Sequence, residues 1–415
     1  MIEKNVTLIG KGVDQETEIK ILTFSDLLAS NVKYKDLDIR EGISFPKRSG
    51  KHKYIPSSRL ARPGDEKEIV QIFKEIYLGK YPFREFEDES EVLKMIEDPN
   101  FLWVVFRNGS GAIIGCIALE LDLDNKRGIL HGLVFRRQYQ GLTDLYKLFT
   151  ASFCSALRIY KKDILSVSCE VRSAHTTSQY MGKLLGFLPV AFLPNKDIFF
   201  NKEESEIIVI VYSEEALSKY RCTKTVKVPY QVLKSYYYAS HKLGIGFFKV
   251  RNDPNLVFKD KKIAKIRSLF VKRVEEDKFG NECVSFSYEN SQAYFRFFHN
   301  KYINNTERVS YEVSTKEELF VFLEKLVEFI QEKKIRYSDC FVSAYNPVHQ
   351  TIFLNAGFEA YGYVPAYKYN KKENTLEDQV VFVYYKGEVN LERLKMIPET
   401  KELVKNLKPL WNLPK

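Results

Sequence analysis

The segment VRSAHTTSQYMGKLLGFLPVAFLPNKDIFF, from Val171 to Phe200, decides how this chain is interpreted, because its pattern recurs. The second segment reads VSAYNPVHQTIFLNAGFEAYGYVPAYKY and runs from Val342 to Tyr369. Each is followed by a strand-like apolar run, EIIVIVY ending at Tyr212 and QVVFVYY ending at Tyr385. Both copies predict a strand, a helix, Gly-Phe, a strand, a polar hairpin and a strand. A repeat this far apart indicates duplicated domains and not a solenoid.

The composition is that of a soluble globular protein. The 415 residues are enough for two domains with full cores, and 45% are hydrophobic while 28% are charged. No run approaches the ~18 apolar residues that span a bilayer, and the first residues lack a signal peptide's apolar centre. The six scattered cysteines have no CxxC spacing, which favours reduced, buried thiols. We therefore expect a cytoplasmic protein with no metal site and no membrane partner.

The net charge of +10 at pH 7 has two interpretations. Lysine and glutamate are interleaved along most of the chain, which is typical of a solvated surface. The alternative is an anionic partner, either a phosphorylated cofactor or RNA. The sequence contains no RNA-binding signature motif, so a nucleic acid is possible but is not the favoured partner.

The order of predicted elements sets the expected domain boundaries. The first copy predicts a strand, two helices, a hairpin, a strand, a helix, a strand, a helix and two strands, with Asp65 capping the first helix. We expect an N-terminal extension (1–54), a first domain (55–214), a connector (215–262), a second domain (263–388) and a helical tail (389–415).

This order, with Gly186-Phe187 and Gly357-Phe358 closing the last helix of each copy, resembles the GNAT acyltransferase superfamily. The resemblance implies an α/β (α+β) fold of two GNAT-like domains, each a mixed, splayed β-sheet flanked by helices. In that family the pantetheine arm of acetyl-CoA inserts where the fourth and fifth strands separate. The resemblance covers residues 59–212 and, more weakly, 283–386. Finer details are similar to the β-lysine acetyltransferase branch, namely Tyr81-Pro82-Phe83, Arg172, Leu193 and Asn195.

The family holds the cofactor's pyrophosphate on a glycine-rich turn after the fourth strand. Backbone amides at a helix N-terminus attract phosphate, and glycine allows close approach. Here the corresponding run is FRRQYQGLTD, from Phe135 to Asp144, in which Gln140 takes the motif's first position. The alternative is a turn in which Thr143 or Asp144 caps the helix, and Asp144 would also repel phosphate. The resemblance implies these cofactor-binding residues: Leu133, Val134, Arg136, Arg137, Gln140, Gly141, Leu142 and Thr143.

The second copy lacks this turn. Its corresponding run, from Glu312 to Glu318, contains no glycine. Thr315 and Glu318 have the spacing of a capping box, so side chains would satisfy this helix end. Adjacent glutamates would repel a pyrophosphate. We expect a structural or substrate-shaping copy that does not bind acyl-CoA.

Acyl transfer to an amine requires a base that deprotonates the amine and a donor that polarises the thioester carbonyl. The base candidates are Glu120 at the end of the third strand, His131 on the fourth and Glu170 on the fifth. Each has an alternative: Glu120 as a solvated strand end, His131 as a hydrogen-bonded, partly buried histidine, and Glu170 as the partner of Arg172. Strand alternation places Glu170 on the same face as Ser166 and Ser168.

Other roles have weaker candidates. Many family members protonate the departing thiolate with a tyrosine on the last helix, but the matching residues here are Gly182 and Phe353. Tyr180 serves only if that helix is shifted, and solvent is the alternative. Tyr81 and Phe83 fall in the loop where the fold builds its acceptor pocket, and simple packing of that loop is the other reading.

Together these features predict an N-acyltransferase that uses acetyl-CoA or another acyl-CoA as co-substrate. The expected acceptor is a primary amine of a small molecule, amino-acid-like or a polyamine. One alternative is a non-catalytic pair of GNAT folds that binds a metabolite or a protein. Another is an aminoacyl-tRNA-dependent transferase, which would explain the basic charge and predicts salt-sensitive tRNA binding. The oligomeric state stays open.

Overall fold

The computed structural model describes residues 23, 26, 37–44, 56–141, 143–246 and 248–407. Most of the expected N-terminal extension, Leu142 and the end of the expected tail lie outside these residues. The chain divides into two compact units. The first comprises Met1–Leu188, Phe199–Lys202 and Ile208–Lys219, and the second Pro189–Ile198, Glu203–Ile207 and Tyr220–Lys415. A single hairpin therefore contributes residues to both units. The domain boundaries expected from sequence stay predictions.

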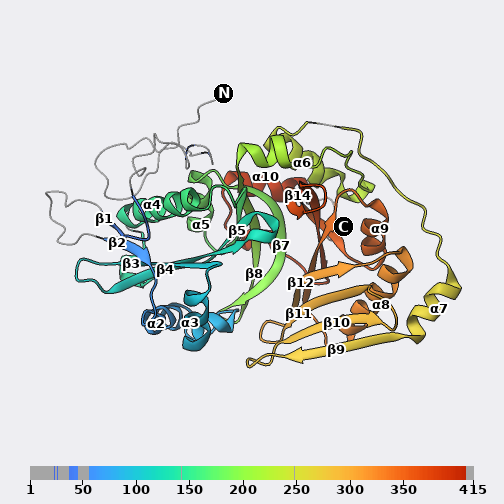
Figure 1. Ribbon diagram of the computed structural model, residues 1–415, viewed down its shortest axis with the longest axis horizontal. Coiled ribbons are helices and arrows are strands. Elements are labelled where there is room, and N and C mark those ends of the chain that lie inside the picture. The colour runs from blue at the N-terminus through green and yellow to red at the C-terminus, as the bar shows by residue number, and fades with distance from the viewer. Residues whose placement is uncertain are drawn as a thin grey trace. The chain divides into compact units, whose positions relative to one another are not determined.

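The first unit is built on a mixed sheet. Its strands are, in spatial order, β1 (Ile43–Ser44), β2 (Ser57–Leu60), β3 (Phe101–Arg107), β4 (Ile113–Asp122), β5 (Arg127–Phe135), β6 (Ser166–Arg172) and β8 (Lys202–Tyr212). Neighbours from β1 to β5 are antiparallel, and β5 and β6 are parallel. Figure 1 shows α2 (Glu66–Tyr77) and α3 (Glu89–Glu97) on one side, and α4 (Thr143–Ile159) on the other. Helix α5 (Thr177–Leu184) follows β6 along the chain.

Helix α2 forms because its apolar residues recur at helical spacing. Ile69, Ile72 and Phe73 are fully buried and pack in one cluster with Trp103 of β3. The prediction that the Asp65 side chain caps this helix is wrong. Its carboxylate instead accepts hydrogen bonds from the Arg59 guanidinium, at 2.6 and 3.1 Å, so a salt bridge takes the capping oxygens.

The second unit has a longer sheet. Its strands are, in spatial order, β7 (Leu188–Phe199), β14 (Glu359–Asn370), β15 (Thr375–Tyr385), β13 (Tyr337–Ser343), β12 (Asn305–Glu312), β11 (Tyr294–Asn300), β10 (Glu282–Tyr288) and β9 (Phe270–Glu276). Its helices are α6 (Leu233–Leu243), α7 (Asp260–Ser268), α8 (Lys316–Glu332), α9 (Pro347–Asn355) and α10 (Pro398–Leu407). One apolar cluster joins α8 and α9 to strands β10 to β15.

The order of elements repeats along the chain. The series β3-β4-β5-α4-β6-α5-β7-β8 is matched by β10-β11-β12-α8-β13-α9-β14-β15. In both series one central pair of strands is parallel, β5 with β6 and β12 with β13, while the hairpins are antiparallel. The predicted fold class, α/β with a mixed sheet flanked by helices in each copy, is confirmed.

The Gly-Phe signature has the same physical cause in both copies. Gly186 and Gly357 have φ of 80° and 90°, the left-handed region that only glycine adopts without strain. This conformation turns the chain back, so that Phe187 N donates to Gly182 O at 3.0 Å and Phe358 N to Phe353 O at 3.1 Å. Both phenylalanine side chains are buried. The dipeptide therefore ends the helix and anchors the next strand.

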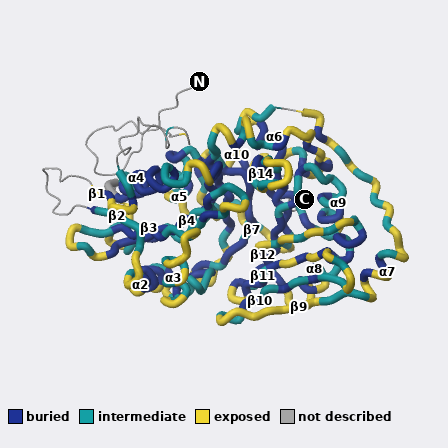
Figure 2. Tube along the Cα trace, viewed as in Figure 1, coloured by how far each residue is buried: buried dark blue, intermediate teal, exposed yellow. Residues whose placement is uncertain are grey.

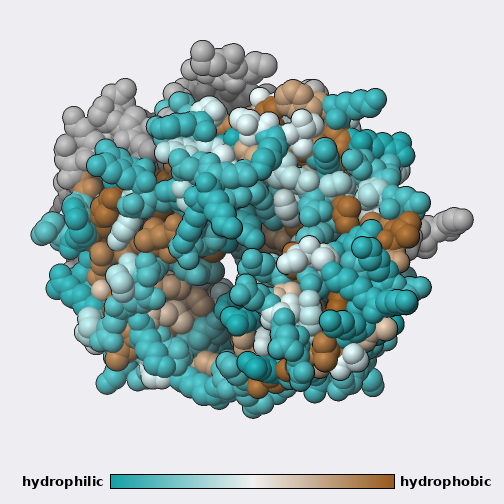
Figure 3. Space-filling model, turned by 45° about the vertical axis from the view of Figure 1, so that its right-hand side comes forward, coloured by the Kyte–Doolittle hydropathy of each residue, from teal (hydrophilic) through white to brown (hydrophobic). Residues whose placement is uncertain are grey.

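Sequence reasoning missed β9 and most of α7. Both are largely exposed, as Figure 2 shows, and their charged residues hide the apolar pattern. Hydrophilic residues also dominate the face of the molecule in Figure 3. Within the described residues, no helix has the length and apolar character needed to cross a membrane. The six cysteines form no disulfide bonds with one another, and four of them are buried.

Candidate active site

The first unit opens where β5 and β6 separate. Their parallel pairing runs from Arg127↔Ser166 to Leu130↔Cys169 and then stops. His131 and Glu170 are the first residues beyond it, and strand alternation places both on one face of the sheet. The same alternation puts Ser166 and Ser168 on that face. Leu133 and Val134 lie past the separation, so the backbone edge that they turn to β6 is not paired with that strand.

A β-bulge shapes β5 at this point. Cys116 is opposite Val134, whereas Ala118 is opposite His131, so β5 carries one extra residue. Gly132 lies in the bulge with φ of 59°. A Cβ atom there would be 2.8 Å from Cζ of Phe73, so only glycine fits. The bulge turns the β5 backbone directly beside the separation of the two strands.

The structure brings two of the predicted bases together. Nε2 of His131 lies 2.9 Å from Oε2 of Glu120 on the neighbouring strand β4. An ionised carboxylate only accepts hydrogen bonds, so Nε2 carries the proton and Nδ1 is left as the acceptor nitrogen. Both side chains reach solvent, with exposed fractions of 33% for His131 and 44% for Glu120. The pair is therefore accessible to a substrate.

Aromatic rings hold the histidine in place. The His131 ring stacks on Phe101, with centroids 6.1 Å apart and planes 10° apart, and the Phe86 ring lies 6.4 Å away. Tyr81 is buried in the same aromatic cluster, 5.6 Å from Phe86, and Phe83 packs on its edge. Substrate contact by Tyr81 and Phe83 stays a prediction beside this packing.

The remaining two candidates lie apart from this pair in the chain. Glu170 is exposed on β6, while Tyr180 is half-buried on α5. The guanidinium of Arg172, two residues after Glu170, lies 3.8 Å from the centre of the Phe199 ring. The catalytic roles of Glu170 and Tyr180 stay predictions.

The expected pyrophosphate turn follows β5 directly. A short 3-10 helix (Arg137–Tyr139) leads to Gly141, which has φ of 82°, and α4 begins at Thr143. Nothing lies within 4 Å of a Cβ atom placed on Gly141, so the backbone there is open to a ligand. Arg137 is exposed, whereas Arg136 pairs with Glu75 and donates to Ile113 O. The side chains of Leu142, Thr143 and Asp144 lie outside the described part of the chain.

Phosphate groups fit this turn in three respects. A long helix begins directly after the turn, Gly141 leaves room for an oxygen atom, and Arg137 places a positive charge at the surface. Arg136 contributes less, because Glu75 neutralises it. The Gln140 side chain donates to Phe135 O at 2.9 Å and so stabilises the turn itself.

The second unit repeats the architecture of the first but lacks the residues of the Glu120–His131 pair. Its strands β12 and β13 pair only at Asn305↔Tyr337 and Thr306↔Ser338 before they separate, and β12 has an equivalent bulge. Register with the neighbouring strand places Glu307 where the first unit has His131, and Asn300 where it has Glu120. The Asn300 side chain accepts from Tyr302 N at 3.1 Å. No glutamate–histidine pair is possible at these positions.

The start of α8 is satisfied by its own side chain, as predicted. Oε2 of Glu318 accepts from Ser314 N at 2.7 Å and from Thr315 N at 3.0 Å. The other oxygen, Oε1, accepts from the Tyr288 hydroxyl at 2.5 Å. A buried carboxylate thus occupies two backbone amides at the start of α8.

Sequence reasoning missed the bulge at Gly132 and the packing of Phe86 and Phe101 on His131. A glycine inside the apolar strand run GILHGLVF was the available signal, since it often marks a bulge. The aromatic contacts had no such signal, because they join residues distant in sequence. Among the described residues, no group of three histidine, cysteine, aspartate or glutamate side chains could hold a metal ion.

No protein-family model matches the sequence, and no curated protein matches it. Solved structures do show similarity to part of the chain. A variant of the spermidine N-acetyltransferase SpeG from Vibrio cholerae is 14% identical over 40% of this chain and 97% of that one, with a TM-score of 0.34. A putative phosphinothricin N-acetyltransferase is 17% identical over 38% and 99%, with a TM-score of 0.32. The putative acetyltransferase yncA from Salmonella typhimurium, solved with acetyl-CoA, is 16% identical over 38% and 95%, with a TM-score of 0.34.

Proposed function

We propose that the first unit transfers an acyl group from an acyl-CoA to a primary amine of a small molecule. The observation that carries this proposal is the Glu120–His131 hydrogen bond, 2.9 Å long, at the place where β5 and β6 separate. A histidine oriented by a carboxylate is a common general base. The opening between the strands gives this base access to a reacting group.

The residues of the first unit divide the work. A primary amine is protonated at neutral pH and must lose a proton before it can attack. His131 takes that proton at Nδ1, and the Glu120 carboxylate stabilises the resulting imidazolium. Acyl-CoA, when bound, supplies the acyl group as an activated thioester. The bulged backbone at Gly132 places its amides beside the separation, where they can polarise a carbonyl oxygen.

The phosphates of the co-substrate would be held by the turn before α4. Gly141, Gln140 and Arg137 are the residues proposed for this contact, and Leu133 and Val134 offer the open edge of β5 to the pantetheine arm. These assignments rest on the open space at Gly141 and on the end of the β5–β6 pairing. The thiolate takes its proton from solvent or from Tyr180.

The charges of the site favour a cationic acceptor. Glu120 and Glu170 both lie on the face that borders the separation, and the rings of Phe86 and Phe101 stand beside His131. Carboxylates attract an ammonium group, and aromatic faces add cation–π attraction. Diamines, polyamines and basic amino acids are therefore the first acceptors to try.

The test is a screen of acceptor amines with acetyl-CoA as the donor. The release of the free thiol of CoA is measured. A panel of polyamines, diamino acids and monoamines without a second cationic group is assayed with the wild-type protein and with His131→Ala. We expect turnover of at least one acceptor that carries a second cationic group, and a loss of about 100-fold in the variant. Equal turnover by both proteins, or acylation of the simple monoamines alone, would contradict the proposed function.

A further inference from the structure

A lysine side chain lies between two carboxylates where β12 and β13 separate. Nζ of Lys196 is 3.7 Å from Oε2 of Glu307 and 3.8 Å from Oδ2 of Asp339. Glu307 on β12 and Asp339 on β13 are the first residues beyond the last paired residues of those strands. All three side chains are nearly excluded from solvent, with exposed fractions of 5 to 8%.

These positions correspond to those of the candidate active site. In the first unit the first residues beyond the parallel pairing are His131 and Glu170, and in the second they are Glu307 and Asp339. The bulges agree, since Gly132 and Arg308 follow His131 and Glu307 with φ of 59° and 55°. The Lys196 amine thus lies where the proposed reaction of the first unit would require an acceptor amine.

The second unit is built to keep an amine there. Two buried carboxylates at one place repel each other, and a buried charge without a counter-charge is costly. Oε1 of Glu307 is buried and has no hydrogen-bond partner in the part of the chain that is described. The Tyr337 hydroxyl donates to Oδ2 of Asp339 at 3.1 Å and fixes that carboxylate. A cation is therefore required, and Lys196 supplies it.

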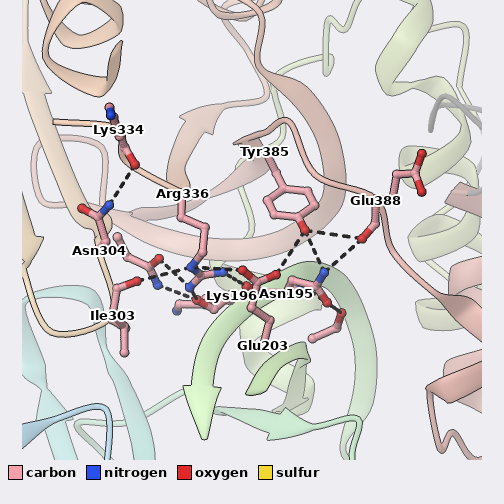
Figure 4. A network of polar contacts seen from close by, with 11 residues as sticks. Asn195, Lys196, Glu203, Ile303, Asn304, Lys334, Arg336, Tyr385 and Glu388 are labelled. Atoms are coloured by element: carbon pink, nitrogen blue, oxygen red, sulfur yellow. Dashed lines mark hydrogen bonds and ion pairs between the residues drawn. The ribbon is translucent and has the colours of Figure 1, made fainter. Parts of the chain in front are cut away.

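The backbone that carries Lys196 is held independently. The Arg336 guanidinium donates to the carbonyl oxygens of Asn195 and Lys196, as Figure 4 shows. The Asn305 side-chain amide also donates to Lys196 O at 2.6 Å. The Asn195 side chain donates to the Tyr385 hydroxyl at 2.7 Å. These contacts orient the hairpin so that Lys196 reaches the carboxylates.

We infer that the strand separation of the second unit is an amine-binding site occupied by Lys196 of the same chain. The comparison of Lys196 with an acceptor amine rests on the proposed function of the first unit, but the presence of the Lys196 amine between the two carboxylates does not. With its own lysine in place, the second unit has no room for an external amine between Glu307 and Asp339. The second unit therefore binds the amine of its own β7–β8 hairpin at the position where the first unit is proposed to bind an acceptor amine.

The test is chemical rescue of stability, measured without acyl-CoA so that it is independent of activity in the first unit. Lys196→Ala removes the amine and is expected to lower the Tm by about 5 °C or more. Ethylammonium should then restore part of the loss in Lys196→Ala, with little effect on the wild type. Tetramethylammonium at equal ionic strength is the control, because it is too bulky and donates no hydrogen bond.

One further variant separates the outcomes. In Lys196→Ala/Glu307→Gln the site has lost one carboxylate, so rescue by ethylammonium should weaken. An unchanged Tm in Lys196→Ala, or equal effects of both ammonium ions, would overturn the inference.

If Lys196→Ala does not fold, native-state acetylation of the wild type by an activated ester gives a second measurement. Lys196 should react at least about tenfold more slowly than Lys219, whose side chain is 63% exposed. Equal rates would overturn the inference as well.

Discussion

The contact between His131 and Glu120 makes the sharpest prediction about single residues. Glu120→Gln keeps a hydrogen-bond partner for Nε2 but removes the charge that stabilises the imidazolium. We expect kcat/KM for the best acceptor to fall about tenfold, with stability changed by less than ~1 kcal/mol because the pair is partly exposed. Steady-state kinetics measures the first value and urea denaturation the second.

Glu215→Gln is the matched control, since it makes the same change on an exposed side chain of the same unit. Its kcat/KM should equal that of the wild type. A Glu120→Gln enzyme as active as this control would show that the carboxylate does not assist His131.

Gly132 gives a second prediction at this scale. Alanine there would adopt a left-handed conformation and also place its Cβ atom 2.8 Å from the Phe73 ring. We expect Gly132→Ala to cost about 2–4 kcal/mol, about 1 from the backbone and the rest from crowding. The free energy of unfolding in urea measures it.

Gly79→Ala is the control, because Gly79 has φ of 69° with nothing within 4 Å of its Cβ position. This variant bears the backbone strain alone and should cost about 1 kcal/mol. Equal costs for the two variants would mean that the bulge tolerates a side chain.

The sequence suggested the candidate residues, but it could not predict how they are arranged. A charged residue and a histidine in apolar strands stand out, which is why Glu120, His131 and Glu170 could be chosen. The contact between Glu120 and His131 depends on the register of β4 with β5, which runs without interruption from Asp122↔Arg127 to Ala118↔His131. Lys196 and Glu307 form an ion pair although they are 111 positions apart in the sequence. No local pattern encodes such a pairing.

At the scale of elements, helix α9 predicts a dependence of stability on pH. Burial lowers the pKa of His349 on this helix to about 4, while an unfolded histidine titrates near 6.5. The unfolded state therefore binds the proton first, and stability that is present above pH 6.5 is lost as the pH falls toward 4. The loss should be about 3 kcal/mol by pH 4.

His349→Gln removes this titration and keeps a polar group near the Tyr311 hydroxyl, which lies 3.3 Å from Nδ1. The difference in unfolding free energy between pH 7 and pH 4 should be smaller in the variant than in the wild type. If both proteins lose the same stability over this range, His349 is not the titrating group.

Elements with a strong local pattern were predicted well. The helix with LFVFLEKLVEFI (Leu319–Ile330) and the two Gly-Phe segments were found because periodicity and glycine chemistry are local properties. Strand β9 was missed because five of its seven residues are exposed and four of those five are charged, so no apolar face appears. The Asp65 cap failed for another reason, since Arg59 competes for the same carboxylate.

For the whole molecule, we expect one acyl-CoA site per chain. The first unit has an open turn at Gly141, whereas in the second Glu318 takes the amides at the start of α8. Lys196 also fills the second strand separation. The duplicated fold is thus expected to carry unequal copies, one for chemistry and one for structure.

Calorimetric titration of acetyl-CoA into the full chain at modest salt tests this claim most directly, with Gly141→Glu as the variant and Gly64→Glu as control. Gly64 is exposed, has φ of 106° and lies in the same unit, so it reproduces the strain and the charge. We expect one site per chain, with binding lost or at least about tenfold weaker in Gly141→Glu and unchanged in Gly64→Glu. Two sites per chain, no binding by the folded protein, or equal affinity in Gly141→Glu would contradict it.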